Sequence, residues 1–156
     1  MKRLLALCLI VLSLAGCGTT GKDNLKAHSV FWENFSLGAI VENNQQYLLP
    51  GARQVFGAES GSSEQPFTQK QEEITLQIEA ADLPAFLQSV QSDIDEAIVN
   101  SGANIIGRGS GGVTGTSFSI DYRENEIYGV INVWGVRGEG TKFFLIVLIS
   151  EGTVGG

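Results

Sequence analysis

Residues 74–106 read ITLQIEAADLPAFLQSVQSDIDEAIVNSGANII, and this stretch decides the predicted fold. It opens with apolar side chains at alternate positions, namely Ile74, Leu76 and Ile78. Such alternation predicts a β-strand with one buried face. Apolar residues then recur at steps of three and four, which predicts a helix with one apolar stripe. That stripe consists of Leu83, Phe86, Leu87, Val90, Ile94, Ala97 and Ile98.

The ends of this helix carry residues that suit its two termini. Asp82 stands where its side chain can cap the first N–H groups. Pro84 falls in the first turn, where its missing N–H costs nothing. Gly102 stands just beyond the last turn, a position that favours a left-handed backbone. Residues 103–106 follow at once and predict a short strand.

The remainder of the C-terminal half is predicted to form strands joined by short turns. Residues 107–115 are rich in glycine and favour a flexible connector. Residues 118–122 alternate, and residues 127–136 indicate a long strand. Residues 143–149 are apolar without alternation, which is typical of a central strand buried on both faces. The order predicts an α+β fold: a mainly antiparallel sheet of about four to five strands with one long helix packed on a face.

The N-terminal half has weaker patterns. The stretch 29–41 is apolar without a clean period, and we interpret it as extended structure. Residues 57–71 collect glycine, serine, glutamate and glutamine, which predicts a loop. Residues 152–156 are expected to form a flexible tail. A single α+β domain is therefore expected at residues 29–151.

The first residues have the three parts of a secretory signal. Lys2 and Arg3 precede an apolar run at residues 4–14, and small residues follow. The run is about 11 residues long, shorter than the roughly 20 that cross a bilayer as a helix. An uncleaved anchor or a buried helix is the alternative interpretation of this run.

The end of this segment, LAGC at residues 14–17, resembles the lipobox of bacterial lipoproteins at all four positions. The resemblance implies cleavage of residues 1–16, a diacylglycerol on the Cys17 thiol, and a further acyl chain such as palmitate on its amino group. Two or more acyl chains anchor a protein stably to a membrane. Gly18, where an aspartate often specifies retention in the inner membrane, favours the outer membrane. Residues 17–28 are then a lipidated tether, and the domain is expected to face the periplasm.

The charge of the chain argues against nucleic acid as a partner. The full sequence carries 10 Lys+Arg against 17 Asp+Glu. Removing the signal takes away Lys2 and Arg3, which leaves 8 basic residues against 17 acidic ones and a net charge of −9. A protein this acidic repels phosphate backbones. The same charge argues against a second, electrostatic attachment to anionic lipid.

Few residue types that carry chemistry remain in the mature chain. Cys8 leaves with the signal and Cys17 is lipidated, so no thiol remains for a disulfide, a zinc site or a nucleophile. His28 is the only histidine and adjoins the tether, where a catalytic base is hard to hold in fixed geometry. We therefore assign no catalytic, cofactor-binding or metal-ligating residue.

Two motifs suggest ion sites but have simpler interpretations. The glycine-rich stretch 107–112 exposes backbone N–H groups beside Arg108, but a strand and not a helix is predicted to follow it, unlike in a phosphate cradle. Asp93, Asp95 and Glu96 form the densest acidic group. They lie on a predicted helix and lack the central glycine of a calcium loop, so a solvated helix face is the better interpretation.

Other carboxylates and the two tryptophans complete the candidates. Asp121 and Glu126 flank one predicted hairpin turn, and two carboxylates about 5–9 Å apart suffice for glycoside hydrolysis. Such pairs are common at hairpin ends, so we do not assign them a catalytic role. Glu72 and the residue after it are interpreted as solubilising charge. Trp134 is expected in the core, and Trp32 is either core or part of a partner surface.

Three functions are compatible with these patterns. The first is a membrane-anchored, non-enzymatic module that binds an envelope protein or supports an assembly. The second is a carboxylate-dependent hydrolase of envelope glycans, and the third is a small-ligand carrier. A filled core with an exposed apolar patch favours the first, and two converging carboxylates in a cleft favour the second. A deep apolar pocket under the helix at residues 83–98 favours the third.

Overall fold

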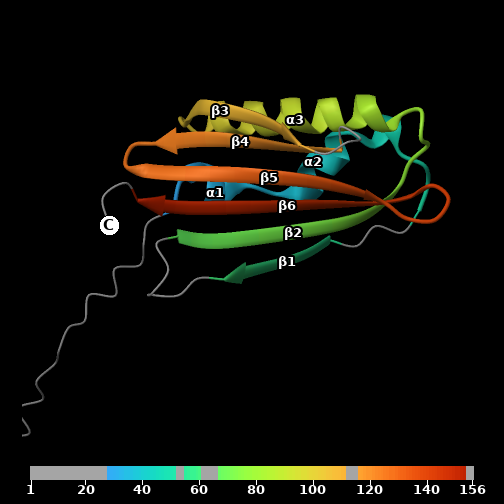
Figure 1. The fold of residues 1–156 in the computed structure, drawn as a ribbon, viewed down its shortest axis with the longest axis horizontal. Helices are drawn as coiled ribbons and strands as arrows, with labels where there is room; N and C mark the ends of the chain where they lie inside the picture. Colours follow the sequence, from blue (N-terminus) through green and yellow to red (C-terminus); the bar gives the residue numbers. More distant parts are fainter. Residues whose placement is uncertain (1–27, 52–54, 61–66, 112–115, 154–156) are drawn as a thin grey trace, which may run out of the picture.

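The computed structural model describes residues 28–51, 55–60, 67–111 and 116–153. These ranges form one antiparallel sheet of six strands in the order β1-β2-β6-β5-β4-β3, with the helices packed on one of its faces (Figure 1). The α+β class, the antiparallel sheet and the single long helix are as predicted.

The elements follow one another along the chain as two short helices, two strands, the long helix and four strands. The strands are β1 (Val55–Ser60), β2 (Phe67–Gln77), β3 (Asn104–Gly111), β4 (Ser117–Glu124), β5 (Ile127–Arg137) and β6 (Lys142–Thr153). The helices are α1 (Val30–Asn34), α2 (Leu37–Asn43), the 3-10 turn η1 (Gln45–Tyr47) and α3 (Leu83–Asn100).

The long helix α3 has the predicted extent and the predicted apolar stripe. Pro84 lies in its first turn, and Gly102 adopts a left-handed backbone with φ +90°. Asp82 precedes the helix, but its side chain makes no capping hydrogen bond because its backbone is already helical rather than extended. Phe86, Val90 and other stripe residues are fully buried against the sheet, so α3 supplies a large part of the core.

The stretch 29–41 is helical, and its predicted extended structure is wrong. Ser29 and Ser36 each cap a short helix by accepting a hydrogen bond from the N–H three residues later. Phe35 breaks the helical run between the two caps, with an extended backbone. This break places the apolar residues of α1 and α2 in different helical phases, which hides the period of each.

The sheet has six strands, where four to five were predicted. The extra strand, β1, lies largely in the range 57–71 that was predicted as a loop. All six of its residues are exposed, because it is an edge strand that pairs only with β2. Its backbone ladder with β2, and not an apolar alternation, therefore makes it a strand.

Two further boundaries differ from the prediction. The glycine-rich stretch at 107–111 continues β3 and pairs with β4, so it is not a connector; residues 112–115 lie outside the described ranges. The last strand, β6, continues to Thr153, two residues beyond the predicted end of the domain. Backbone pairing with β2 and β5 extends the strand into the polar sequence that follows residue 149.

Strand β6 is central, as predicted, because it lies between β2 and β5. Only one of its faces is fully buried, so burial on both faces is wrong. Leu145 and Val147 face the helices and are completely buried, whereas Phe144, Ile146 and Leu148 face the other way and are half-buried. The helices cover one side of the sheet and leave the other side open.

Candidate functional site

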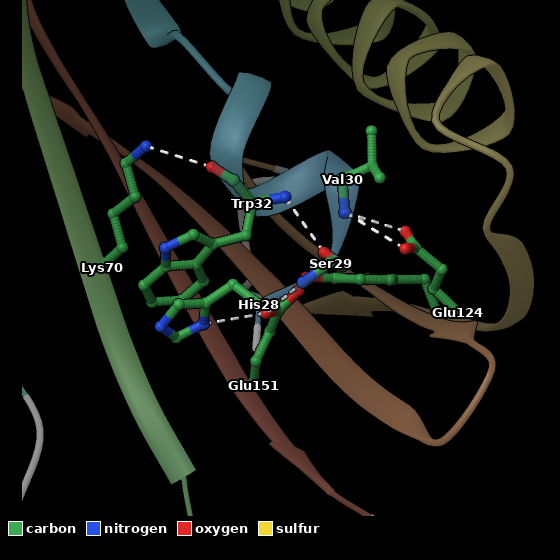
Figure 2. A network of polar contacts seen from close by, with 8 residues as sticks. His28, Ser29, Val30, Trp32, Lys70, Glu124 and Glu151 are labelled. Atoms are coloured by element: carbon green, nitrogen blue, oxygen red, sulfur yellow. Dashed lines mark hydrogen bonds and ion pairs between the residues drawn. The ribbon is translucent and has the colours of Figure 1, made fainter. Parts of the chain in front are cut away.

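A buried carboxylate fastens the start of α1 to the last strand. Glu151 of β6 is only 3% exposed. Its carboxylate accepts a hydrogen bond from the Ser29 backbone N–H at 3.1 Å and others from the Ser29 and Tyr122 hydroxyls. The Nδ1 atom of His28 lies 3.2 Å from the same carboxylate, as Figure 2 shows. Four polar groups from two segments of the chain therefore converge on one side chain of a third segment, β6.

The sheet register explains how Tyr122 reaches this carboxylate. Tyr122, Gly129 and Glu151 are consecutive partners across β4, β5 and β6 on the helix-covered face. A Cβ atom at Gly129 would lie 2.1 Å from the tyrosine ring, so only glycine lets the ring cross this strand. Burial, and then the negative charge of Glu151, raise the pKa of Tyr122 far above its ordinary value.

Charged side chains of the sheet also form hydrogen bonds with the backbone groups at both ends of α1. The Glu124 carboxylate accepts from the Val30 N–H at 3.1 and 3.2 Å. At the other end, the Lys70 ammonium donates to the carbonyl of Trp32 at 3.3 Å (Figure 2). It also donates to the carbonyl of Phe35 at 3.2 Å. Carboxylates at a helix N-terminus and cations at its C-terminus complement the helix dipole. A helix of five residues is not stable on its own, so these contacts with the sheet stabilise α1.

Glu72 caps the N-terminus of α2, as Glu124 caps that of α1. The Glu72 carboxylate accepts from the Leu37 N–H at 2.8 Å and lies 3.4 Å from the Lys70 ammonium. Glu72 is buried, so its interpretation as solubilising charge is wrong. Its neighbour Glu73 does lie on the open face of the sheet, as the register with Ile146 requires.

The serine, histidine and carboxylate at this site are not arranged as a catalytic triad. A triad needs the histidine between the serine and the carboxylate, so that the histidine can remove the serine proton. Here the Ser29 hydroxyl donates directly to Glu151, and Ser29 is fully buried. His28 lies on the other side of the carboxylate and stacks on Trp32, with 4.3 Å between the ring centroids. The structure thus holds His28 in fixed geometry, and it places Trp32 in the core. The cluster is a structural anchor.

The open face of the sheet carries the second notable arrangement, a band of apolar side chains on the neighbouring strands β5 and β6. Paired residues of antiparallel strands share a face, so the register aligns this band across β6 and β5, and Glu73 and Thr75 of β2 separate it from Phe56 of β1. Trp134 is 39% exposed and Val136 is 50% exposed, and the prediction that Trp134 lies in the core is wrong. The band consists of Val130, Trp134, Val136, Phe144, Ile146 and Leu148.

This open face is electrically neutral. Its charged residues in the six strands are two acids, Glu73 and Asp121, and two bases, Arg123 and Lys142. The full chain has a net charge of −7. The excess negative charge therefore lies on the helix side and in the loops, because residues 1–27 carry four basic residues and one acidic residue. A hollow of about 320 Å³ lies in this face between Phe56 and Phe144.

The predicted acidic group on α3 is divided among separate partners. Asp93 accepts from the Asn44 side chain at 2.7 Å, and Asp95 pairs with Arg108 at 2.9 Å. Within the described part of the chain, no group of three or more His, Cys, Asp or Glu side chains is arranged to hold a metal ion. Because Arg108 is engaged by this helix and lies within a strand, it does not form part of a phosphate cradle.

The carboxylates considered for hydrolysis lie apart along the β4–β5 hairpin. Asp121 lies in β4 on the open face, beside Gly107, and Glu126 lies exposed in the turn. About 10 Å of strand separates Asp121 from Glu124, the last residue of β4 before the turn begins. Completely buried side chains, among them Phe86 and Val90, fill the middle of the space between α3 and the sheet. An open hollow of about 720 Å³ lies at one end, between the first turns of α3 and the last residues of β5.

The predicted lipid-attachment residue, Cys17, lies outside the described residues. Among the residues that are described, no helix has the length and apolar character needed to cross a bilayer. No protein-family model matches the chain, and a comparison with curated proteins finds no match.

Proposed function

We propose that this protein is a lipid-anchored lipoprotein of the cell envelope that acts as a non-enzymatic binding or assembly-support module. Cys17 carries its acyl chains, and the domain faces the periplasm from the outer membrane. Its binding surface is the open face of the sheet, and its partner is a protein. The lipobox sequence supports the anchoring, and the exposed apolar band supports the binding role.

The observation that carries the binding role is the apolar band itself. Antiparallel sheets in small domains commonly pack one face on the core and expose a polar second face. Here the second face exposes Trp134, Val136 and Phe56, and Phe144 and Ile146 lie half-buried between them. Contiguous exposed apolar patches mark interaction surfaces in soluble proteins.

The anchor at Glu151 supports an orientation for this surface. His28 and Ser29, where the proposed tether joins the domain, contact Glu151 on the helix-covered side of the sheet. The open face therefore points away from the side on which the tether joins. That orientation leaves the band accessible to a protein partner in the periplasm.

The test is photo-crosslinking in intact cells from two matched positions. A photoreactive residue replaces Trp134 on the open face or Val99, which is 60% exposed on α3. We expect position 134 to capture an envelope protein that mass spectrometry identifies, and position 99 to capture far less of it. Equal capture from both positions would contradict the assignment of the binding surface.

A further inference from the structure

We propose that the open face binds a second copy of the same chain, so that two sheets pack face to face. This inference rests on the proposed function, because it takes the open face as the binding surface. It adds the identity of the partner.

The size of the face suits a stable dimer. Six strands spaced by about 4.8 Å give a width of about 29 Å, and the 11 residues of β5 span about 36 Å. The face therefore covers up to about 1,000 Å² in projection. A stable interface of standard size buries about 800 Å² on each partner. The open face is therefore large enough for a stable dimer, which would use most of it.

Among the surfaces of the described residues, the charge distribution favours self-association through this face. The chain is acidic overall, so two copies repel each other through most of their surfaces. The open face has two acids and two bases in its strands and no net charge. Because Glu73 and Lys142 occur on both copies, opposite charges are available across a symmetric interface.

The arrangement of apolar and polar side chains has the anatomy of such an interface. The apolar band centres on β5 and β6, the middle of the sheet, with Trp134 beside Ile146. Polar residues flank it on both sides, with Gln69 and Gln71 on β2 and Ser117 and Ser119 on β4. Interfaces have an apolar core and a polar rim. A two-fold axis over β5 and β6 brings the band of one copy onto that of the other, as in sheet-on-sheet packing.

A bilayer fits this face less well than a second copy does. Membrane-surface proteins present basic residues around their apolar side chains, whereas Glu73, Gln71 and Asn132 lie among or next to the apolar residues here. The tether also joins the domain on the opposite side of the sheet. A second copy supplies both apolar and polar groups to match this mixture.

Sedimentation of the full chain carrying Cys17→Ser tests the proposal without detergent. The matched variants are Val136→Glu on the open face and Val99→Glu on α3, which remove the same side chain at similar exposure. We expect the parent and the α3 variant to dimerise alike, and the open-face variant to associate at least about tenfold more weakly. Trp134→Gln provides a second open-face variant if Val136→Glu does not fold. A parent that stays monomeric, or open-face variants that dimerise fully, would overturn the proposal.

Crosslinking in cells separates this proposal from the proposed function. Asn132→Cys places a thiol within the face, and Gln88→Cys places one on the exposed side of α3. Linkage of two copies through position 132 alone supports the dimer. Linkage of position 132 only to a different envelope protein overturns the dimer and leaves the binding face in place. No linkage from position 132 overturns the dimer and the binding face together.

Discussion

The Tyr122 hydroxyl donates a hydrogen bond to the Glu151 carboxylate across the glycine that separates them in the sheet. The same carboxylate holds the first residues of α1, so one buried acid connects β4, β6 and the N-terminal helix. This acid determines where the proposed tether meets the domain. The contacts of α1 with Glu151, Glu124 and Lys70 all lie on the helix-covered face, so they leave the apolar band on the opposite face exposed.

Removing this carboxylate is expected to destabilise the fold strongly. Glu151→Ala leaves the Ser29 N–H and hydroxyl and the Tyr122 hydroxyl without an acceptor. Each unsatisfied buried donor costs about 1–3 kcal/mol, so we expect a loss of at least about 3 kcal/mol in the free energy of unfolding. Glu124→Ala, which also removes a cap of α1, serves as the control and is expected to cost about 1 kcal/mol. Urea denaturation measures both, and equal losses would contradict the anchoring role of Glu151.

The raised pKa of Tyr122 predicts how stability responds to high pH. Its phenol remains protonated in the folded protein where an unfolded tyrosine ionises, near pH 10. The folded state then binds more protons than the unfolded state, so stability falls as the pH rises above about 10 and is unaffected by this group below that pH. The slope from this one group approaches about 1.4 kcal/mol per pH unit. Urea unfolding between pH 8 and about 11 should show a shallower decline for Tyr122→Phe, and equal slopes would contradict the burial of the phenol.

The two faces of β6 allow a matched pair of leucine truncations. Leu145→Ala removes a fully buried side chain from the helix-covered face and is expected to cost about 2–5 kcal/mol. Leu148→Ala removes the same atoms from the open face, where the side chain is half-buried, and is expected to cost clearly less in a monomer. Thermal or urea unfolding compares the two at low protein concentration. A Leu148→Ala loss as large as that of Leu145→Ala would mean that the open face is covered within the monomer.

Lipidation is tested by a single substitution. Cys17→Ser removes the thiol that the lipobox resemblance identifies as the site of the lipid, so the variant is expected to leave the membrane fraction. Fractionation after a wash at high salt measures this. If the serine variant remains in the membrane pellet, the chain is held there by something other than acyl chains.

The long helix and the order of the later elements were predictable because their patterns are local. Leu83 to Ile98 repeat at helical spacing, and the hairpins are marked by short polar turns. The paired helices at residues 29–41 were missed because two serine caps interrupt the helical period. The edge strand β1 was missed because it depends on backbone pairing with β2 and carries no buried side chain.

The anchor was missed because it is formed by contacts across more than 100 residues. Ser29 and Glu151 meet only once the sheet has formed. One signal was present: Glu151 follows Leu145, Val147 and Ile149 at the same alternation, on the face that the strand buries. A charged residue at an alternate position of a strand whose other side chains on that face are buried indicates that the charge has a buried partner. The open face was missed because the unbroken apolar run of β6 was interpreted as burial on both sides, although one side is left open.

Quenching of Trp134 by acrylamide tests most directly that this open face is the surface the protein uses. Trp32 is buried and provides an unquenched reference, whereas Trp134 is exposed in the monomer. Dilute Cys17→Ser protein should therefore show one quenchable tryptophan, which Trp134→Phe removes. In membranes that carry the lipidated protein at its native level, Trp134 should be shielded by a second copy. Equal quenching of Trp134 in both preparations would contradict the account.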